Sequence, residues 1–344
     1  MLLAGVRVIV FAGHMAAFAR PSQTDVKDRI LTKSEPSGEY YDWTKTKKPE
    51  RPYIHDYSQT LTVKLFLAAK EPNDGCKVYL TFEKALEVIG KLDNITCGIP
   101  KIAYLVGWQF NGHDSKYPSW AEVNPRLKRP QDATARESLC WLMAEGRRYH
   151  TTVSLHINMF DAYEESPLWK EYLEKDIIAK DLAGNPLEGE VFDAPGATPR
   201  IDTQSYQVSY AREWELGLAQ RRIDGLLATM PIQEAGTIHI DAFHSMTPVR
   251  HAYPQERYPS RTKEDKGISP YLGYTLEQEV VTQRKTCSYF RDRGVDVISE
   301  GTNFLRPDAF TGLQPMAWNC MSSARMGIFG ARAGRICRND TCQE

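Results

Sequence analysis

The feature that most constrains the fold of this chain is a regular alternation of short apolar strands and helices that begins near residue 101. Strands are predicted at Lys101–Trp108, Thr152–Met159, Thr237–Phe243 and Val295–Ser299, with a fifth at Leu313–Trp318. The intervening helices are predicted at Ala133–Glu145, capped by Asp132, at Ser205–Leu218 and at Thr275–Arg293. Strands that alternate with helices form a parallel sheet, either in a barrel or in a doubly wound fold.

Polar side chains follow four of these strands. They are His113 and Asp114, then Asn158, then Asp241 and His244, and finally Glu300 and Asn303. In a barrel, the loops after the strands converge on one mouth, and catalytic groups gather there. No Gly-rich phosphate loop follows any strand, which removes the main support for a nucleotide-binding doubly wound fold. The pattern therefore favours a (β/α) barrel with a polar site at the carboxyl ends of its strands.

Two acids, Asp241 and Glu300, occupy equivalent positions at the ends of successive strands. A glycosidase needs two carboxyl groups that face one sugar bond, one to protonate the leaving oxygen and one to attack or to activate water. Either acid alone is better explained as a helix cap or a salt-bridge partner. Their equivalent placement makes a catalytic pair an equally good interpretation.

The segment Gly107–Pro118 (GWQFNGHDSKYP) then points to a family. It resembles the Gly-His-Asp-Ser substrate-site stretch of family 101 glycoside hydrolases. These are endo-α-N-acetylgalactosaminidases, which remove Gal-β1,3-GalNAc from Ser or Thr of mucin-type glycoproteins. The order of His-Asp loop, strand-end Asp and strand-end Glu is also similar, and the resemblance extends over roughly Ile102–Trp318.

This resemblance implies a (β/α)8 TIM barrel and a retaining hydrolase that needs no cofactor. It also implies Asp241 as nucleophile, Glu300 as acid/base, and His113 and Asp114 as ligands of sugar hydroxyls. Asn158 and Trp318 are further substrate-binding candidates, Trp318 by stacking on a sugar face. His156 is a second-rank candidate, because a lone histidine is more often a satisfied core residue than a ligand. The loop Pro248–Tyr271 lengthens the spacing between the two acids beyond that expected of the family, which leaves strict endo specificity open. The alternatives are an exo-acting α-glycosidase of a related barrel family and a non-catalytic sugar-binding remnant.

The chain divides into four predicted regions. Residues 1–19 are either a signal peptide ending in Ala17-Phe18-Ala19 or a cut strand, and the first interpretation predicts a secreted or cell-surface protein. Residues 20–95 form an irregular segment with strands at Leu61–Ala69 and Lys77–Phe82 and a helix at Phe82–Leu92. The barrel domain is predicted at 96–330, followed by a basic tail at 331–344. Four or five strands, where a closed barrel has eight, predict an incomplete barrel in a truncated member of the family.

Composition excludes several classes of partner. The net charge is −1 with a pI near 6.7, so no basic field attracts nucleic acid or anionic lipid, and an O-glycan or glycoprotein is the expected partner. No apolar run reaches membrane-spanning length. The seven cysteines match no zinc module, and free thiols are favoured over a Cys76–Cys97 disulfide. His239 and His244 fall on opposite faces of a strand, so no transition-metal site is predicted.

Overall fold

The structure is a computed structural model that describes part of the chain. The described residues are 8–11, 53–57, 59–180, 183–186, 205–241, 243, 272–274, 276–300 and 313–314. Residues 8–11, 276, 277, 280, 300, 313 and 314 are described by their backbone alone.

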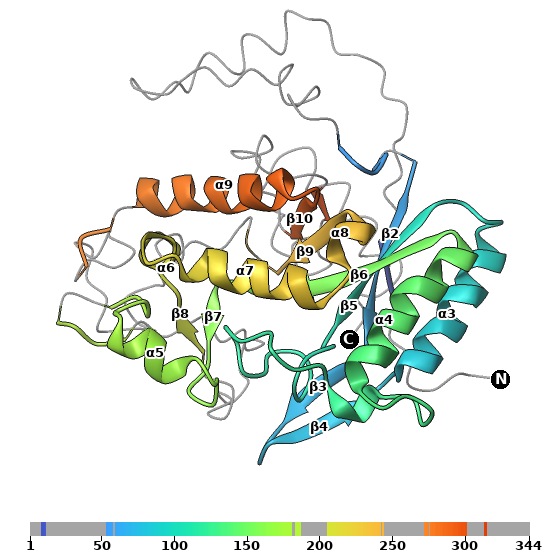
Figure 1. Cartoon of the computed structure of the whole chain (residues 1–344), viewed down its shortest axis with the longest axis horizontal. Coiled ribbons are helices and arrows are strands. Elements are labelled where there is room, and N and C mark those ends of the chain that lie inside the picture. Colours follow the sequence, from blue (N-terminus) through green and yellow to red (C-terminus); the bar gives the residue numbers. More distant parts are fainter. Residues whose placement is uncertain are drawn as a thin grey trace, which may run out of the picture.

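Seven strands form one sheet (Figure 1). In spatial order they are β1 (Val8–Phe11), β2 (Leu61–Phe66), β5 (Lys101–Val106), β6 (Thr151–Ile157), β9 (Thr237–Ile240), β10 (Asp296–Glu300) and β11 (Leu313–Gln314). β1 is antiparallel to β2, and every other neighbouring pair is parallel. From β2 onward the strands lie in chain order, as in a (β/α) barrel. Among the described residues the sheet stays open.

Helices cover the outer face of this sheet, and short elements lie in the connections (Figure 1). The longer helices are α3 (Phe82–Ile95), α4 (Ala135–Glu145), α7 (Leu218–Thr229) and α9 (Leu276–Asp292). The short ones are α5 (Trp169–Glu174), α6 (Tyr210–Glu215), α8 (Ile232–Ala235) and the 3-10 turns at Pro125–Leu127 and Gly146–Tyr149. Two hairpin-like pairs complete the fold, β3 (Ala68–Glu71) with β4 (Gly75–Val78) and β7 (Asp161–Ala162) with β8 (Tyr206–Gln207).

Alternation along the strands separates an apolar outer face from an inner face that carries polar side chains beside a small apolar cluster of Ile102, Tyr104 and Ile298. Val63 and Leu65 of β2 belong to the core cluster that includes residues of α3 and α4, whereas Lys64 between them is buried without joining that cluster. Successive strand side chains point to opposite faces, so positions two apart share one environment. The buried polar side chains of the inner strands therefore lie inside the curved sheet. They are Lys64, Ser154, His156, His239 and Asp296.

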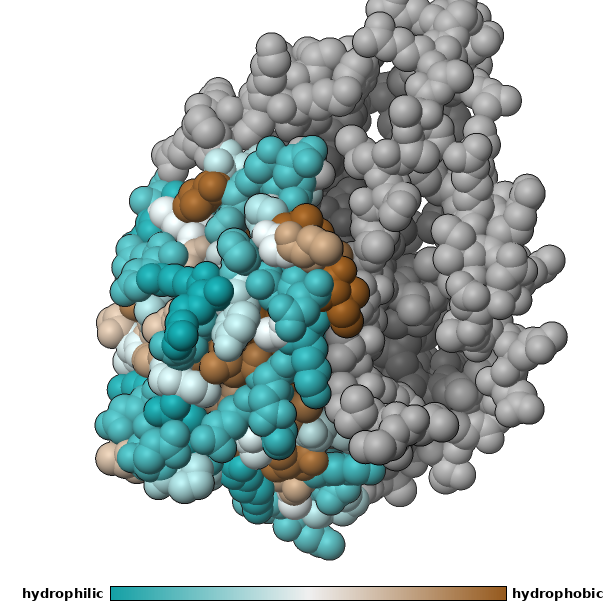
Figure 2. Space-filling view, turned by 90° about the vertical axis from the view of Figure 1, so that its right-hand side faces the viewer, coloured by the Kyte–Doolittle hydropathy of each residue, from teal (hydrophilic) through white to brown (hydrophobic). Residues whose placement is uncertain are grey.

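The surface that Figure 2 shows is mainly hydrophilic where residues are described, with hydrophobic residues in small separate groups. Single exposed apolar residues of this kind are normal on a soluble surface. Among the described residues, none of the helices has both the length and the apolar character needed to cross a bilayer.

The amino-terminal end of the sheet is closed by residues 53–57. The Tyr57 hydroxyl donates to Asp296 Oδ2 at 3.2 Å and to Thr237 Oγ1 at 3.0 Å, and the backbone N–H of Ile54 donates to the same Asp296 oxygen at 2.8 Å. Tyr104 adds a hydroxyl contact to Thr237 at 2.6 Å. This polar layer fills the end of the sheet opposite the loops that follow the strands.

Two of the predicted elements differ from the structure. The strand predicted at Lys77–Phe82 is wrong, because its first residues end the β3–β4 hairpin and Phe82 already begins α3. The helix predicted at Ser205–Leu218 is wrong in extent, because it divides into β8, α6 and the start of α7 at Leu218. Gly217 ends α6 with a φ of 71°, a conformation that ordinary residues adopt at a cost and glycine does not.

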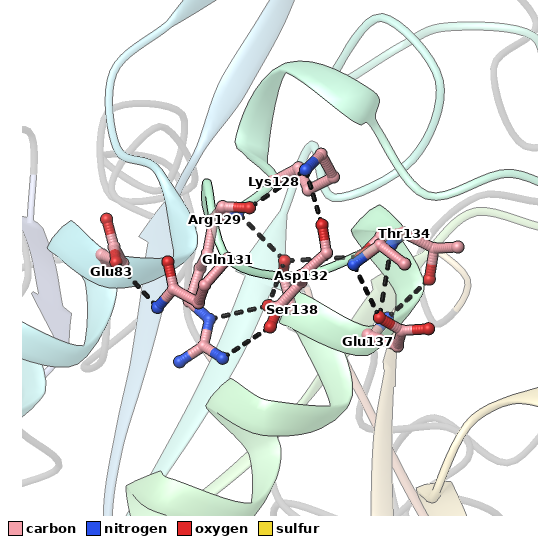
Figure 3. Close-up of polar contacts among 9 residues, drawn as sticks. Glu83, Lys128, Arg129, Gln131, Asp132, Thr134, Glu137 and Ser138 are labelled. Atoms are coloured by element: carbon pink, nitrogen blue, oxygen red, sulfur yellow. Dashed lines mark hydrogen bonds and ion pairs between the residues drawn. The ribbon is translucent and has the colours of Figure 1, made fainter.

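The predicted cap of α4 is also wrong. Thr134, not Asp132, is the N-cap, and it forms a reciprocal capping box with Glu137. Asp132 instead pairs with the guanidinium of Arg129 at 2.7 Å and accepts from the Ser138 hydroxyl at 2.6 Å (Figure 3). Two candidate caps two residues apart satisfy the sequence rule equally, and the loop before the helix decides between them.

Cys76 and Cys97 form no disulfide in the described part of the chain. Free thiols are therefore confirmed at Cys76, Cys97 and Cys140, but Cys97 is exposed and the other two are only partly buried.

Candidate active site

The loop that carries His113 and Asp114 is held against the β3–β4 hairpin by its backbone. The N–H of His113 donates to the carbonyl of Ala68 at 2.9 Å, and the N–H of Lys70 donates to the carbonyl of His113. Gly107 lies at a φ of 76°, and a Cβ there would lie 2.0 Å from the Ala68 oxygen. At Gly112, which has a φ of 112°, a Cβ would lie 2.7 Å from the Ala68 backbone. The glycines of the Gly107–Pro118 segment are therefore needed for two backbones to approach closely.

Asp241 follows β9 and lies beside two histidines. Its backbone N–H donates to the carbonyl of Ile157 at 2.7 Å, which keeps β9 paired with β6 to this point. Its Oδ2 lies 3.4 Å from Nε2 of His156, whose side chain is only 2% exposed. The ring of His113 lies 5.4 Å from that of His156, edge to face. Three segments distant in sequence thus meet at one point.

His156 is held from both sides. His239, its register partner on β9, stacks on it with ring centroids 4.8 Å apart and an interplanar angle of 11°. The indole N–H of the buried Trp108 donates to the His156 carbonyl at 2.9 Å. The Trp108 bond fixes the backbone of His156, and the stacking on His239 orients the His156 ring next to Asp241.

Electrostatics keep the Asp241 carboxyl group ionised. Burial by itself would raise the pKa of Asp241, but His156, His113 and the ammonium of Lys64 together hold it well below the usual range. Burial lowers the pKa of His156 to about 4, so at neutral pH this imidazole is uncharged. Burial also lowers the pKa of Lys64, to about 8, which leaves the ammonium mostly protonated at pH 7. Lys64 thus supplies a positive charge that faces Asp241 at neutral pH.

Two further carboxyl groups lie in the field of Asp241. Burial raises the pKa of Asp114, although the neighbouring His113 opposes this. Burial and the charge of Asp114 raise the pKa of Asp161 to about 7. Asp161 accepts from the Ser205 hydroxyl at 2.8 Å and from the Asn158 amide at 2.6 Å. The site therefore combines one strongly ionised carboxylate with two that hold protons more readily, which is the contrast that acid–base chemistry uses.

Several predicted site residues come together in the structure. His113, Asp114, Asn158 and Asp241 all lie at the carboxyl ends of the strands. The Asn158 side-chain oxygen accepts from the backbone N–H groups of Phe160 and Asp161, so this residue shapes the turn after β6. The Glu300 backbone ends β10, the strand beside β9, and its side chain lies outside the described residues. Trp318, His244 and Asn303 also lie outside them.

Sequence reasoning missed two residues of the site, Lys64 and Asp161, and gave His156 only second rank. His156 was interpreted as a satisfied core histidine, but it faces Asp241. Lys64 and Asp161 were not considered. A signal for Lys64 existed, because a lysine in the middle of the apolar strand LTVKLF is rarely buried unless a charge faces it.

Fold and site together define the chain as a (β/α)-barrel protein with its polar groups at the carboxyl ends of the strands. Residues 68–257, more than half of the chain, match the family model described as endo-alpha-N-acetylgalactosaminidase, glycoside hydrolase family 101. The chain therefore belongs to this family of glycoside hydrolases, as the Gly107–Pro118 segment predicted.

Comparison with solved structures supports the fold. The alpha-N-acetylgalactosaminidase NagBb from Bifidobacterium bifidum, as a quadruple mutant, aligns with a TM-score of 0.52 and 12% identity over 74% of this chain and 37% of that chain. The same protein solved as a GalNAc complex gives a TM-score of 0.52 and 11% identity, over 74% and 36%. This chain thus spans little more than a third of the length of these structures, and at such identities the likeness concerns the fold alone. A comparison with curated proteins found no match.

Proposed function

We propose that the protein is a retaining hydrolase that releases α-linked N-acetylgalactosamine, as Gal-β1,3-GalNAc, from Ser or Thr of O-glycoproteins. The observation that carries this proposal is Asp241, a largely buried carboxylate kept ionised at the end of β9 beside the His113–Asp114 loop. A nucleophile must be deprotonated before the sugar arrives, and this environment ensures it.

In the reaction we propose, Asp241 attacks the anomeric carbon while protonated Glu300 donates its proton to the departing Ser or Thr oxygen. Glu300 then takes a proton from the water that cleaves the glycosyl–Asp241 ester, and the sugar leaves with its original α configuration. Support for the partner comes from topology: β10 lies next to β9 in parallel, so the carboxyl ends of both strands reach the same edge of the sheet.

Substrate recognition is assigned to the loop after β5. The carboxyl group of Asp114 and the imidazole of His113 are 3.5 Å apart at their nearest polar atoms. Both lie close to Asp241, because His113 helps to lower the pKa of Asp241 and the charge of Asp241 helps to raise the pKa of Asp114. An imidazole and a carboxyl group side by side can donate to and accept from neighbouring hydroxyls of a sugar ring.

The test uses the aryl α-glycosides of Gal-β1,3-GalNAc and of GalNAc. The 344-residue chain is expected to hydrolyse the disaccharide substrate weakly, because its barrel is incomplete, and proton NMR should detect the α anomer as the first product. Asp241→Ala should lower kcat by about 10³-fold or more. Azide should restore turnover of this variant and yield the β-glycosyl azide, because azide enters from the face that the carboxylate occupied.

The control is Asp224→Asn, which changes a carboxylate that pairs with Arg293 on the surface and should leave turnover unchanged. Hydrolysis of the GalNAc glycoside alone would indicate exo action. Binding of the disaccharide without turnover would indicate a sugar-binding protein and refute the proposal.

A further inference from the structure

The structure brings together three groups that could hold a metal ion. His113, His156 and Asp241 each offer one ligand atom, and these atoms all lie within 4.8 Å of one another. The residues come from the loop after β5, from β6 and from the end of β9. Neither histidine was predicted as a metal ligand, because the metal site that the sequence analysis weighed and rejected involved His239 and His244.

Three imidazole nitrogens of this group make no hydrogen bond of good geometry, although His156 Nε2 lies 3.4 Å from Asp241 Oδ2. Among the described residues, neither ring nitrogen of His156 and not Nδ1 of His113 has a hydrogen-bond partner, although all three atoms are shielded from solvent. A buried polar atom without a partner costs about 1–3 kcal/mol. Buried imidazole nitrogens without a hydrogen bond, next to a carboxylate, are the arrangement expected of metal ligands before the ion binds.

We propose that His113, His156 and Asp241 form a binding site for a divalent transition-metal ion, with Zn²⁺ preferred, and that the bound ion inhibits the enzyme. Two imidazoles and one carboxylate are a donor set that zinc accepts readily. Ligand atoms about 2.0–2.2 Å from a tetrahedral ion are about 3.3–3.6 Å apart. His156 Nε2 and Asp241 Oδ2 already have this separation, at 3.4 Å, and the ligand atom of His113 lies within 4.8 Å of both.

Asp114 strengthens the case for His113. Its Oδ2 lies 3.5 Å from Nε2 of His113, on the other side of the ring from the unpartnered Nδ1. A metal-binding histidine commonly donates its second N–H to a carboxylate, which orients the ring and makes the ligand nitrogen more basic.

Inhibition follows from the identity of the third ligand. An ion on Asp241 engages the oxygen that would attack the anomeric carbon, so metal and sugar exclude each other. This consequence rests on the proposed function, whereas metal binding itself does not.

The experiment uses Co²⁺ as a spectroscopic probe in the 344-residue chain after removal of adventitious metal with a chelator. We expect one equivalent of Co²⁺ to bind, to give visible absorption of the strength typical of four-coordinate sites, and to be displaced by Zn²⁺. His156→Ala should weaken Co²⁺ binding by more than a hundredfold, and Asp114→Asn by about 10–100-fold. His150→Ala is the matched control, because His150 is an exposed histidine paired with Asp93 and should have no effect.

His113→Gln is a second ligand variant, on a loop residue, for the case that His156→Ala fails to fold. Absence of the visible bands, or unchanged affinity in whichever ligand variants fold, would overturn the site. Binding of Co²⁺ by a chain that never hydrolyses the disaccharide would refute the proposed function and leave the site standing. Activity without Co²⁺ binding would refute the site alone, and activity undiminished in the Co²⁺-loaded chain would refute the inhibition.

Discussion

Replacement of Arg222 tests how much a buried ion pair next to the loop that carries His113 and Asp114 contributes to stability. Arg222 of α7 pairs with Glu213 of α6 through two hydrogen bonds, of 2.7 Å and 3.0 Å, and the two side chains are 5% and 0% exposed. A third bond joins the guanidinium to the carbonyl of Pro118 at 2.8 Å, at the end of that loop. The guanidinium also lies 4.2 Å from the ring centre of Trp120.

Arg222→Met should destabilise the protein by about 3–5 kcal/mol, the usual cost when one partner of a buried pair is removed and the other charge remains. Glu213 would retain only the hydroxyl of Tyr172 as a hydrogen-bond donor among the described side chains. Arg222→Met/Glu213→Gln removes both charges and should recover most of the loss, because a buried pair as a whole contributes little. The measurement is urea unfolding at pH 7 followed by circular dichroism.

Arg221→Met is the matched control for this prediction. Arg221 is the preceding residue, but its side chain is 55% exposed and pairs with Glu171 on the surface, so its loss should cost less than about 1 kcal/mol. If Arg222→Met unfolds within 1 kcal/mol of the wild type, or if the double variant is no more stable than Arg222→Met, the reasoning about the buried pair is wrong.

Three further predictions concern the site and its surroundings. Gly107→Ala should destabilise the protein by at least about 2 kcal/mol in urea unfolding, because of its positive φ and the contact with the Ala68 oxygen, whereas Gly225→Ala, with open space around it in α7, should be neutral or stabilising. Burial raises the pKa of Glu279 to about 7, so the folded state holds this proton more tightly than the unfolded state does. The free energy of unfolding should therefore fall by about 3 kcal/mol from pH 4.5 to pH 7. Glu279→Gln should lose this pH dependence, and an unchanged pH profile in the variant would contradict the raised pKa of Glu279. Asp114→Asn should lower kcat/KM by about a hundredfold, because hydrogen bonds to sugar hydroxyls tighten at the transition state; wild-type turnover would mean that the loop is structural.

The sequence by itself determined the order of the elements and the edge of the sheet that carries the site. Local patterns suffice for this, because an apolar run followed by a polar residue reports both a buried strand and the end of that strand. Asp241, His113 and Asp114 were found in this way. The family was found from one loop whose glycines are required by the close approach of the β3–β4 hairpin.

The tertiary structure alone decided which side chains meet. His156 looked like a core residue of its own strand and Lys64 was not considered, and only the register of β2, β5, β6 and β9 turns both toward Asp241. Register is set by pairing between segments far apart in the chain, and one residue of slippage would move each of these side chains to the other face of the sheet. The protonation states of the site follow from the same contacts, because burial and neighbouring charges are properties of the assembled sheet and not of any single strand.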